Sequence, residues 1–361
     1  MRRKQRRGDA TQRDQRSIPT QAPLAGALRR GIKGVIARWA VATCSGERPT
    51  PQDEALHGLS GDVEGYTFAL VQPDAALVAR LEWLPHRERR RVSMVVLLGE
   101  QAYAPSSAGI VVVTGRHLPA WSAGGLELDC VDPLHVWTVR FSGQLEHVPG
   151  DVVDGAVGVS QCVLDMTFDA SAPAFVPGID DDDELRARHL GDATWDAQLV
   201  RALRNGFGRG YVQVGDGHGS MLLGDRAVPI RGAVIREHGW GMLDWHACKW
   251  GYRCLVSLED DTVGWVHHTD FPWLTLEGGF SNEKPRGVQP LRGIGLTQER
   301  SPTGLPVRIS LTLERSDRLL QLHGEVRSVF PMELDGRATL RVALMRLTGE
   351  VKGWAVWVEG P

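Results

Sequence analysis

The sequence predicts an all-β protein with two antiparallel β-barrel or sandwich domains in tandem. Its 361 residues include 42 Gly, 20 Pro and 12 Trp, and short runs of β-forming residues are separated by turn residues. No helical pattern long enough for a crossover connection lies between these runs, which favours an antiparallel meander over a parallel sheet. A chain of this length exceeds what one core usually organises, so we expect two domains.

The first predicted β domain covers residues 51–176. Its expected strands follow one another from Tyr66 to Ala170, with turn signals such as Gln72-Pro73-Asp74 between them. The stretch from Pro173 to Glu184 combines prolines with an acidic run, so we expect an exposed linker. Strand patterns then resume, and the second predicted β domain covers residues 185–361.

Residues 1–50 are predicted to hold a basic disordered tail followed by an amphipathic helix. Residues 1–23 are rich in Arg, Gln, Thr and Pro, and residues 24–42 place apolar side chains at helical spacing among four cationic ones. The helix either docks on the domain or makes a peripheral contact with a membrane surface. The net charge of -3 gives no reason to expect a nucleic acid partner.

The expected location is the cytoplasm, with membrane association through the basic segment as the alternative. The basic start lacks the apolar run of a secretory signal, and no uninterrupted apolar stretch is long enough to span a bilayer. The five cysteines are odd in number and scattered, which argues against a disulfide framework.

The stretch from Arg236 to Trp245 is the densest in chemistry, because ten residues hold a cation, two acids, a histidine and two indoles. We expect a loop or a bulged strand within a β-rich region. Burial beside an indole raises the pKa of a carboxyl group, so Asp244 is a candidate general acid. Arg236 can pair with Glu237 or Asp244. The alternative is a buried ion-pair network that closes the barrel, with the tryptophans as core.

Other patterns carry weaker signals. His238, His246, His267, His268 and Asp270 lack the tight spacing of a zinc motif, and no metal or organic cofactor is predicted. The acidic run at 180–184 lacks the spacing of a calcium loop. The glycines at 215–219 have no helix pattern after them, so they are expected to serve a turn rather than a phosphate.

The sequence Arg-Glu-His-Gly-Trp-Gly-Met-Leu-Asp-Trp at 236–245 resembles the Arg-Asp-His-Ser-Trp-Gly-x-Arg-Asp-Trp pattern of bacterial relatives of the carotenoid 1,2-hydratase superfamily. The resemblance covers roughly residues 53–361 and implies two lipocalin-like β domains with a pocket for a hydrophobic ligand. This chain departs from the pattern at Glu237, Gly239 and Leu243. The last change removes an Arg that would pair with Asp244.

The residues and the resemblance together predict a hydratase that adds water to an unactivated double bond of a terpenoid or similar hydrophobic small molecule. Asp244 is the expected general acid, His238 with Glu237 the water-activating pair, and Arg236 their ionic partner. The expected substrate-binding residues are Trp240, Trp245, Met242 and Trp265. The alternatives are a cyclase or isomerase that shapes a polyene, or a lipid-binding protein without catalysis.

Overall fold

The computed structural model describes residues 48–57, 63–84, 88–105, 110–114, 121–148, 158–197, 199, 209–242, 249–334 and 338–360. The basic tail and the amphipathic helix predicted for residues 1–47 therefore lie outside the described residues. Within the described ranges, no helix is both long enough and apolar enough to cross a bilayer. The three cysteines described, Cys130, Cys162 and Cys254, are free thiols, as the scattered spacing predicts.

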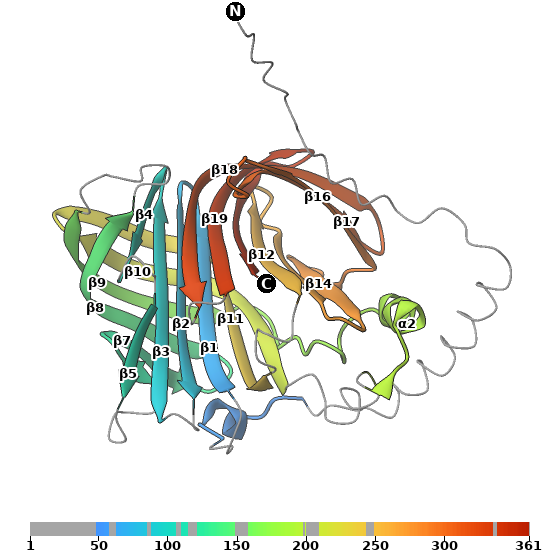
Figure 1. The fold of residues 1–361 in the computed structure, drawn as a ribbon, viewed down its shortest axis with the longest axis horizontal. Helices are drawn as coiled ribbons and strands as arrows, with labels where there is room; N and C mark the ends of the chain where they lie inside the picture. The colour runs from blue at the N-terminus through green and yellow to red at the C-terminus, as the bar shows by residue number, and fades with distance from the viewer. Residues whose placement is uncertain are drawn as a thin grey trace, which may run out of the picture.

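The first sheet has eleven strands and closes into a barrel (Figure 1). β4 pairs with both β3 and β8, so the order β4-β3-β2-β1-β11-β10-β9-β8 forms a ring of eight strands, with β5, β6 and β7 outside it. Closure leaves no free edge in the ring. The strands of this sheet are β1 (Val63–Gln72), β2 (Ala75–Leu84), β3 (Arg89–Leu98), β4 (Gln101–Ala104), β5 (Ile110–Thr114), β6 (Ser122–Ala123), β7 (Leu126–Asp132), β8 (Val136–Val148), β9 (Val159–Ala170), β10 (Arg209–Leu223) and β11 (Arg226–Met242).

The second sheet has nine antiparallel strands in the order β15-β14-β13-β12-β20-β19-β18-β17-β16 and curls beside the barrel (Figure 1). Its strands are β12 (Trp250–Leu258), β13 (Val263–Asp270), β14 (Thr275–Glu283), β15 (Gly287–Pro290), β16 (Gly293–Arg300), β17 (Pro306–Glu314), β18 (Leu319–Leu334), β19 (Ala338–Gly349) and β20 (Gly353–Gly360). The predicted all-β class with two barrel-like units is confirmed.

The two sheets do not divide at the boundary drawn from the sequence. β10 and β11 follow the expected linker, yet they are hydrogen-bonded between β9 and β1 and complete the first barrel. The dense motif, which we placed in residues 185–361 with the second domain, is therefore carried by a strand of the first sheet. The second sheet begins only at Trp250.

Apolar side chains form three layers. The barrel interior is filled by residues such as Phe68, Trp137 and Phe168. A second layer, which includes Val71 and Phe330, lies between the outside of the barrel and the facing side of the second sheet. The third layer fills the concave side of that sheet. One face of β11 contributes to the first layer and the other face to the second.

The segment expected to be an exposed linker is instead packed against the barrel. Phe175 is buried and exchanges backbone hydrogen bonds with Val212 of β10. One residue of the acidic run caps a helix: the Asp182 side chain accepts hydrogen bonds from the backbone N–H groups of Glu184 and Leu185 at the start of helix α2 (Asp183–Asp192). The 3-10 turn η1 (Pro51–Glu54) precedes β1.

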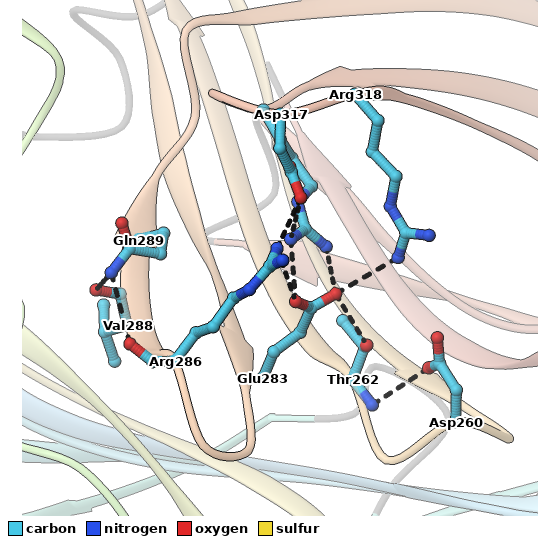
Figure 2. A network of polar contacts seen from close by, with 9 residues as sticks. Asp260, Thr262, Glu283, Arg286, Val288, Gln289, Asp317 and Arg318 are labelled. Atoms are coloured by element: carbon cyan, nitrogen blue, oxygen red, sulfur yellow. Dashed lines mark hydrogen bonds and ion pairs between the residues drawn. The ribbon is translucent and has the colours of Figure 1, made fainter.

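A charged network fastens one end of the second sheet (Figure 2). The carboxylate of Glu283 accepts hydrogen bonds from Arg315, at 2.8 Å through Nη2, and from Arg318 at 3.1 Å. Asp317, in the β17–β18 turn, pairs with Arg286, in the β14–β15 turn. Arg315 is buried, so the network ties the β17–β18 turn to the end of β14.

The glycines at 215–219 lie inside β10 rather than in a turn. β10 is paired on both sides along this stretch, and a Cβ built on Gly215 would meet the backbone oxygen of Asp169 at 2.2 Å. These glycines thus allow β9 and β10 to approach closely.

Gly215→Ala is expected to lower the free energy of unfolding by about 2 kcal/mol or more, because the colliding atom is backbone and cannot rotate away. Gly158→Ala is the matched control, since the nearest atom to its added Cβ is 3.9 Å away. Urea denaturation of both variants measures the effect. Equal midpoints for the two variants would contradict the close approach.

Candidate functional site

Successive side chains of the motif strand point to opposite sides of the barrel wall. β11 is paired with β1 on one side and β10 on the other, so Arg236 lies opposite Phe68 and Gln213, while His238 lies opposite Tyr66 and Tyr211. Arg236, His238 and Trp240 face the barrel interior and its end, and Glu237 faces the second sheet. Of the two predicted forms, a loop or a bulged strand, the motif takes the second. The pairing of β11 with β1 skips Gly241, whose φ is 63°.

Arg236 is fully buried and holds η1 over the barrel end. Its guanidinium donates hydrogen bonds to both carboxylate oxygens of Glu54, at 2.7 and 2.8 Å, and another to Gln213. Aromatic rings surround the cation, with Trp137 at 5.2 Å and Tyr211 at 5.3 Å from the guanidinium carbon. Arg236 therefore forms an ion pair, but its partner is Glu54 rather than Glu237.

Both members of this pair stay ionised. Burial alone would raise the pKa of Glu54, but hydrogen bonds and charge from Arg236 outweigh burial and lower that pKa. For Arg236, burial would lower the pKa, and the interactions with Tyr211 and Glu54 raise it instead. A buried cation and anion that neutralise each other close the end of the barrel, as the ion-pair interpretation of the motif expects.

His238 lies beside this pair and is also buried. Its Nε2 atom is 3.2 Å from Oε1 of Glu64, its Nδ1 atom is 3.3 Å from the Tyr211 hydroxyl, and its ring stacks on Tyr66 with 3.9 Å between centroids. Burial lowers the pKa of His238, despite the opposing effect of Glu64. The ring is therefore held neutral in a fixed orientation.

His57 completes this group from the segment after η1. Its Nδ1 atom is 2.8 Å from the same oxygen of Glu64, its Nε2 atom is 3.4 Å from Asp53, and its ring stacks on Trp240 at 4.3 Å. Ligand atoms of His57, Glu64 and His238 all lie within 4.8 Å of one another. Sequence reasoning missed His57 and Glu64, because the second lies 174 residues from His238 and no local spacing connects them.

Glu237 lies in a different place, a cavity of about 50 Å³ between the barrel and the second sheet. Its carboxylate accepts a hydrogen bond from Nε1 of Trp265 at 2.9 Å and pairs with Arg253 at 3.1 Å. The rest of the lining is mainly apolar, with Ile235 on β11 and Leu255 on β12. This combination of an apolar wall with a few fixed polar groups is typical of a small-molecule site.

A second carboxylate lies at the polar side of the same cavity. Glu82 is almost fully buried and pairs with Arg80 and Arg91, each at 2.5 Å. Burial would raise the pKa of Glu82, but the two guanidinium groups outweigh burial and lower it. Glu82 is therefore ionised, and the cavity has a charged polar side opposite its apolar wall.

Comparison with known proteins assigns the family. The model of the family described as Domain of unknown function (DUF7064) matches residues 50–359, which include both sheets. The chain belongs to the DUF7064 family. No curated protein matches its sequence at a significant level.

Solved structures are similar to this DUF7064 chain at low identity. The structure of an AttH-type protein from Nitrosomonas europaea is 13% identical, with 87% of this chain and 97% of that chain covered and a TM-score of 0.51. Kievitone hydratase from Nectria haematococca is 11% identical, with 87% and 95% covered and a TM-score of 0.49. CghA with Sch210972 is 10% identical, with 82% and 88% covered and a TM-score of 0.46.

The residues predicted for the site of this DUF7064 chain do not form one cluster. Arg236, His238 and Trp240 share the barrel end, and Glu237 and Trp265 meet in the cavity between the sheets. The prediction that His238 and Glu237 act together on one water is wrong, because their side chains lie on opposite faces of β11. Asp244 and Trp245 lie outside the described residues, and the backbone of Met242 pairs with Val63 at the end of β11.

The alternative histidine cluster is also divided. His267, His268 and Asp270 lie on β13 of the second sheet, whereas His238 lies inside the barrel. His268 is 3.2 Å from Asp270 and 3.4 Å from Glu277, so it belongs to an ion-pair group of its own. His246 lies outside the described residues.

Glu54→Gln is expected to lower the free energy of unfolding at pH 7 by about 3 kcal/mol, because it leaves Arg236 charged and buried without its counter-ion. The pKa of Glu54 in the folded chain lies below its ordinary value of 4.5, so its stabilisation is complete above pH 4.5 and is lost as the pH falls below that value. The difference between wild type and variant should therefore shrink on acidification.

Denaturant unfolding between pH 7 and pH 3 measures this difference, with Glu325→Gln on the exposed face of β18 as the control. A difference that stayed constant over the whole range would show that Glu54 does not couple protonation to folding.

Proposed function

We propose that this DUF7064 chain is a hydro-lyase that adds water across an unactivated double bond of a hydrophobic, terpenoid-like molecule. The observation that carries the proposal is the cavity between the sheets, in which the carboxylate of Glu237 faces a mainly apolar wall. The resemblance of the motif at 236–245 to that of carotenoid 1,2-hydratase relatives supports the same reaction class. The apolar lining matches the hydrocarbon character of a terpenoid.

Glu237 is held in the orientation that a general base needs. Trp265 donates a hydrogen bond to one carboxylate oxygen, and Arg253 pairs with the other. In the proposed reaction, an acid gives a proton to one alkene carbon, and a water oxygen bonds to the other carbon. The proton that the attacking water loses passes to Glu237. The indole of Trp265 can stabilise the cationic carbon, and Asp244 stays the predicted acid from its position in the motif.

The size of the cavity sets a condition on binding. Ligand pockets usually enclose about 300–1,000 Å³, whereas this cavity has about 50 Å³. One wall belongs to the barrel, and the other includes Met332 and Leu340 of β18 and β19. A terpenoid therefore requires these walls to separate, and the flexible side chain of Met332 lowers the cost of that change.

A cyclase or isomerase is the second candidate, because nine of the fifteen lining residues are apolar. Such an enzyme folds a polyene and accelerates ring closure by proximity, without proton transfer from a side chain. The two candidates differ in which residue matters most. A cyclase depends on the shape given by Trp265, and a hydro-lyase depends on the carboxylate of Glu237.

Incubation of the wild type with a panel of prenyl alcohols in ¹⁸O-labelled water should yield a labelled alcohol. Glu237→Gln should reduce the rate by about 10²- to 10⁴-fold, the usual contribution of a general base. Glu325→Gln is the matched control because its carboxylate is exposed on β18. Mass spectrometry of the products measures the label.

Equal labelling by wild type and Glu237→Gln would remove the proposed role of Glu237. Rearranged but unlabelled product that Trp265→Ala abolishes and Glu237→Gln spares would establish the cyclase. An unchanged hydrophobic compound that co-purifies with the chain, with no product from any substrate in the panel, would favour the lipid-binding alternative.

A further inference from the structure

The barrel end holds three metal-ligating groups that the proposed reaction does not use. They are His57 after η1, Glu64 on β1 and His238 on β11, and their ligand atoms lie within 4.8 Å of one another. We propose that these three side chains bind a divalent transition-metal ion of the zinc class. The inference goes beyond the proposed function, because this site lies inside the barrel and Glu237 lies on the other face of β11.

The partners of His57 determine which of its nitrogens can bind an ion. Nε2 is 3.4 Å from the carboxylate of Asp53, and an ionised carboxylate only accepts hydrogen bonds. The proton of a neutral His57 ring is therefore on Nε2. The other nitrogen, Nδ1, then has a free lone pair and faces Oε1 of Glu64 at 2.8 Å.

In His238, likewise, one ring nitrogen faces an outer partner and the other faces Glu64, but here Nε2 is the nitrogen that faces Glu64. A hydroxyl oxygen can accept a hydrogen bond, and that of Tyr211 lies 3.3 Å from Nδ1 of His238. From this contact we assign the proton of the His238 ring to Nδ1. This leaves the lone pair of Nε2 pointing at the same oxygen of Glu64, at 3.2 Å.

Two lone pairs that face one carboxylate oxygen repel each other unless something positive lies between them. A metal ion meets this requirement for both nitrogens and the oxygen at once. The hydrogen bonds from the outer ring nitrogens to Asp53 and Tyr211 are the kind that orient metal-bound histidines and fix their tautomers. Stacking of His57 on Trp240 and of His238 on Tyr66 also restricts both rings.

The ligand set and its burial indicate the class of ion. Two imidazoles and one carboxylate suit zinc and neighbouring transition metals, whereas magnesium and calcium prefer oxygen ligands throughout. Glu64 and His238 are almost fully buried, and the His57 side chain is 21% exposed. Three protein ligands leave one coordination position of a four-coordinate ion open. The ion would join the segment after η1 to two strands of the barrel.

Chelator-treated full-length protein, titrated with Zn²⁺ alone in a calorimeter, should bind one equivalent. His57→Ala should weaken this binding by at least about 100-fold, and Asp53→Asn by about 10-fold through loss of the orienting hydrogen bond. His57 is partly exposed, so its removal leaves the barrel core intact. His218→Ala is the matched control. His218 is exposed on β10 and pairs with Asp169 of the neighbouring strand β9.

The same samples loaded with Co²⁺ should show a visible absorption band that His57→Ala removes and His218→Ala keeps. Absence of saturable Zn²⁺ binding, or equal affinity in wild type and His57→Ala, would overturn the metal site and show that protons occupy the space between the nitrogens and Glu64. Zinc binding without labelled alcohol from any substrate would leave this site standing and remove only the hydro-lyase proposal.

Discussion

The alternation of side chains along β11 is the constraint on which the arrangement of both sites depends. β11 is hydrogen-bonded on both edges, to β1 and β10, so its register is fixed and its successive side chains must alternate between the two faces of the sheet. Arg236 and His238 therefore enter the barrel, and Glu237 between them faces the second sheet. Three consecutive residues of one motif serve two separate environments. Gly241 ends this regularity, because the extra residue there bulges the strand.

The buried charge of Arg236 explains why η1 lies over the barrel end. A guanidinium inside an apolar barrel requires an anion, and Glu54 at the end of η1 provides one with two hydrogen bonds. Once Glu54 is fixed, the chain that follows brings His57 beside Glu64 and Trp240. The histidine and carboxylate group at the barrel end is thus a consequence of neutralising one arginine.

Local patterns in the sequence predicted the fold class of the protein. Period-two runs and turn residues were sufficient for the all-β class, since each signal lies within one hairpin. The partners of the motif were not predictable, because Glu54 and Glu64 lie more than 170 residues before Arg236 and His238. Pairing between distant strands follows no local signal, and the adjacency of Glu237 and His238 in sequence suggested a shared role that a strand forbids.

The assignment of strands to sheets failed for a related reason. The segments at 209–223 and 226–242 have sequence patterns typical of β-strands, but these patterns do not indicate which sheet each strand joins. The acidic stretch before them was read as a linker from its composition. One of its aspartates, Asp182, instead caps α2, and this role cannot be predicted without knowing where the helix begins.

The pairing of β1 with β11 also bears on how the chain is synthesised. β1 ends at Gln72, and its second neighbour in the barrel is not complete until Met242. During translation the N-terminal strands therefore leave the ribosome long before the strand that covers their open edge, and an uncovered edge is prone to pair with other chains. An N-terminal fragment that stops before β11 would keep that edge exposed.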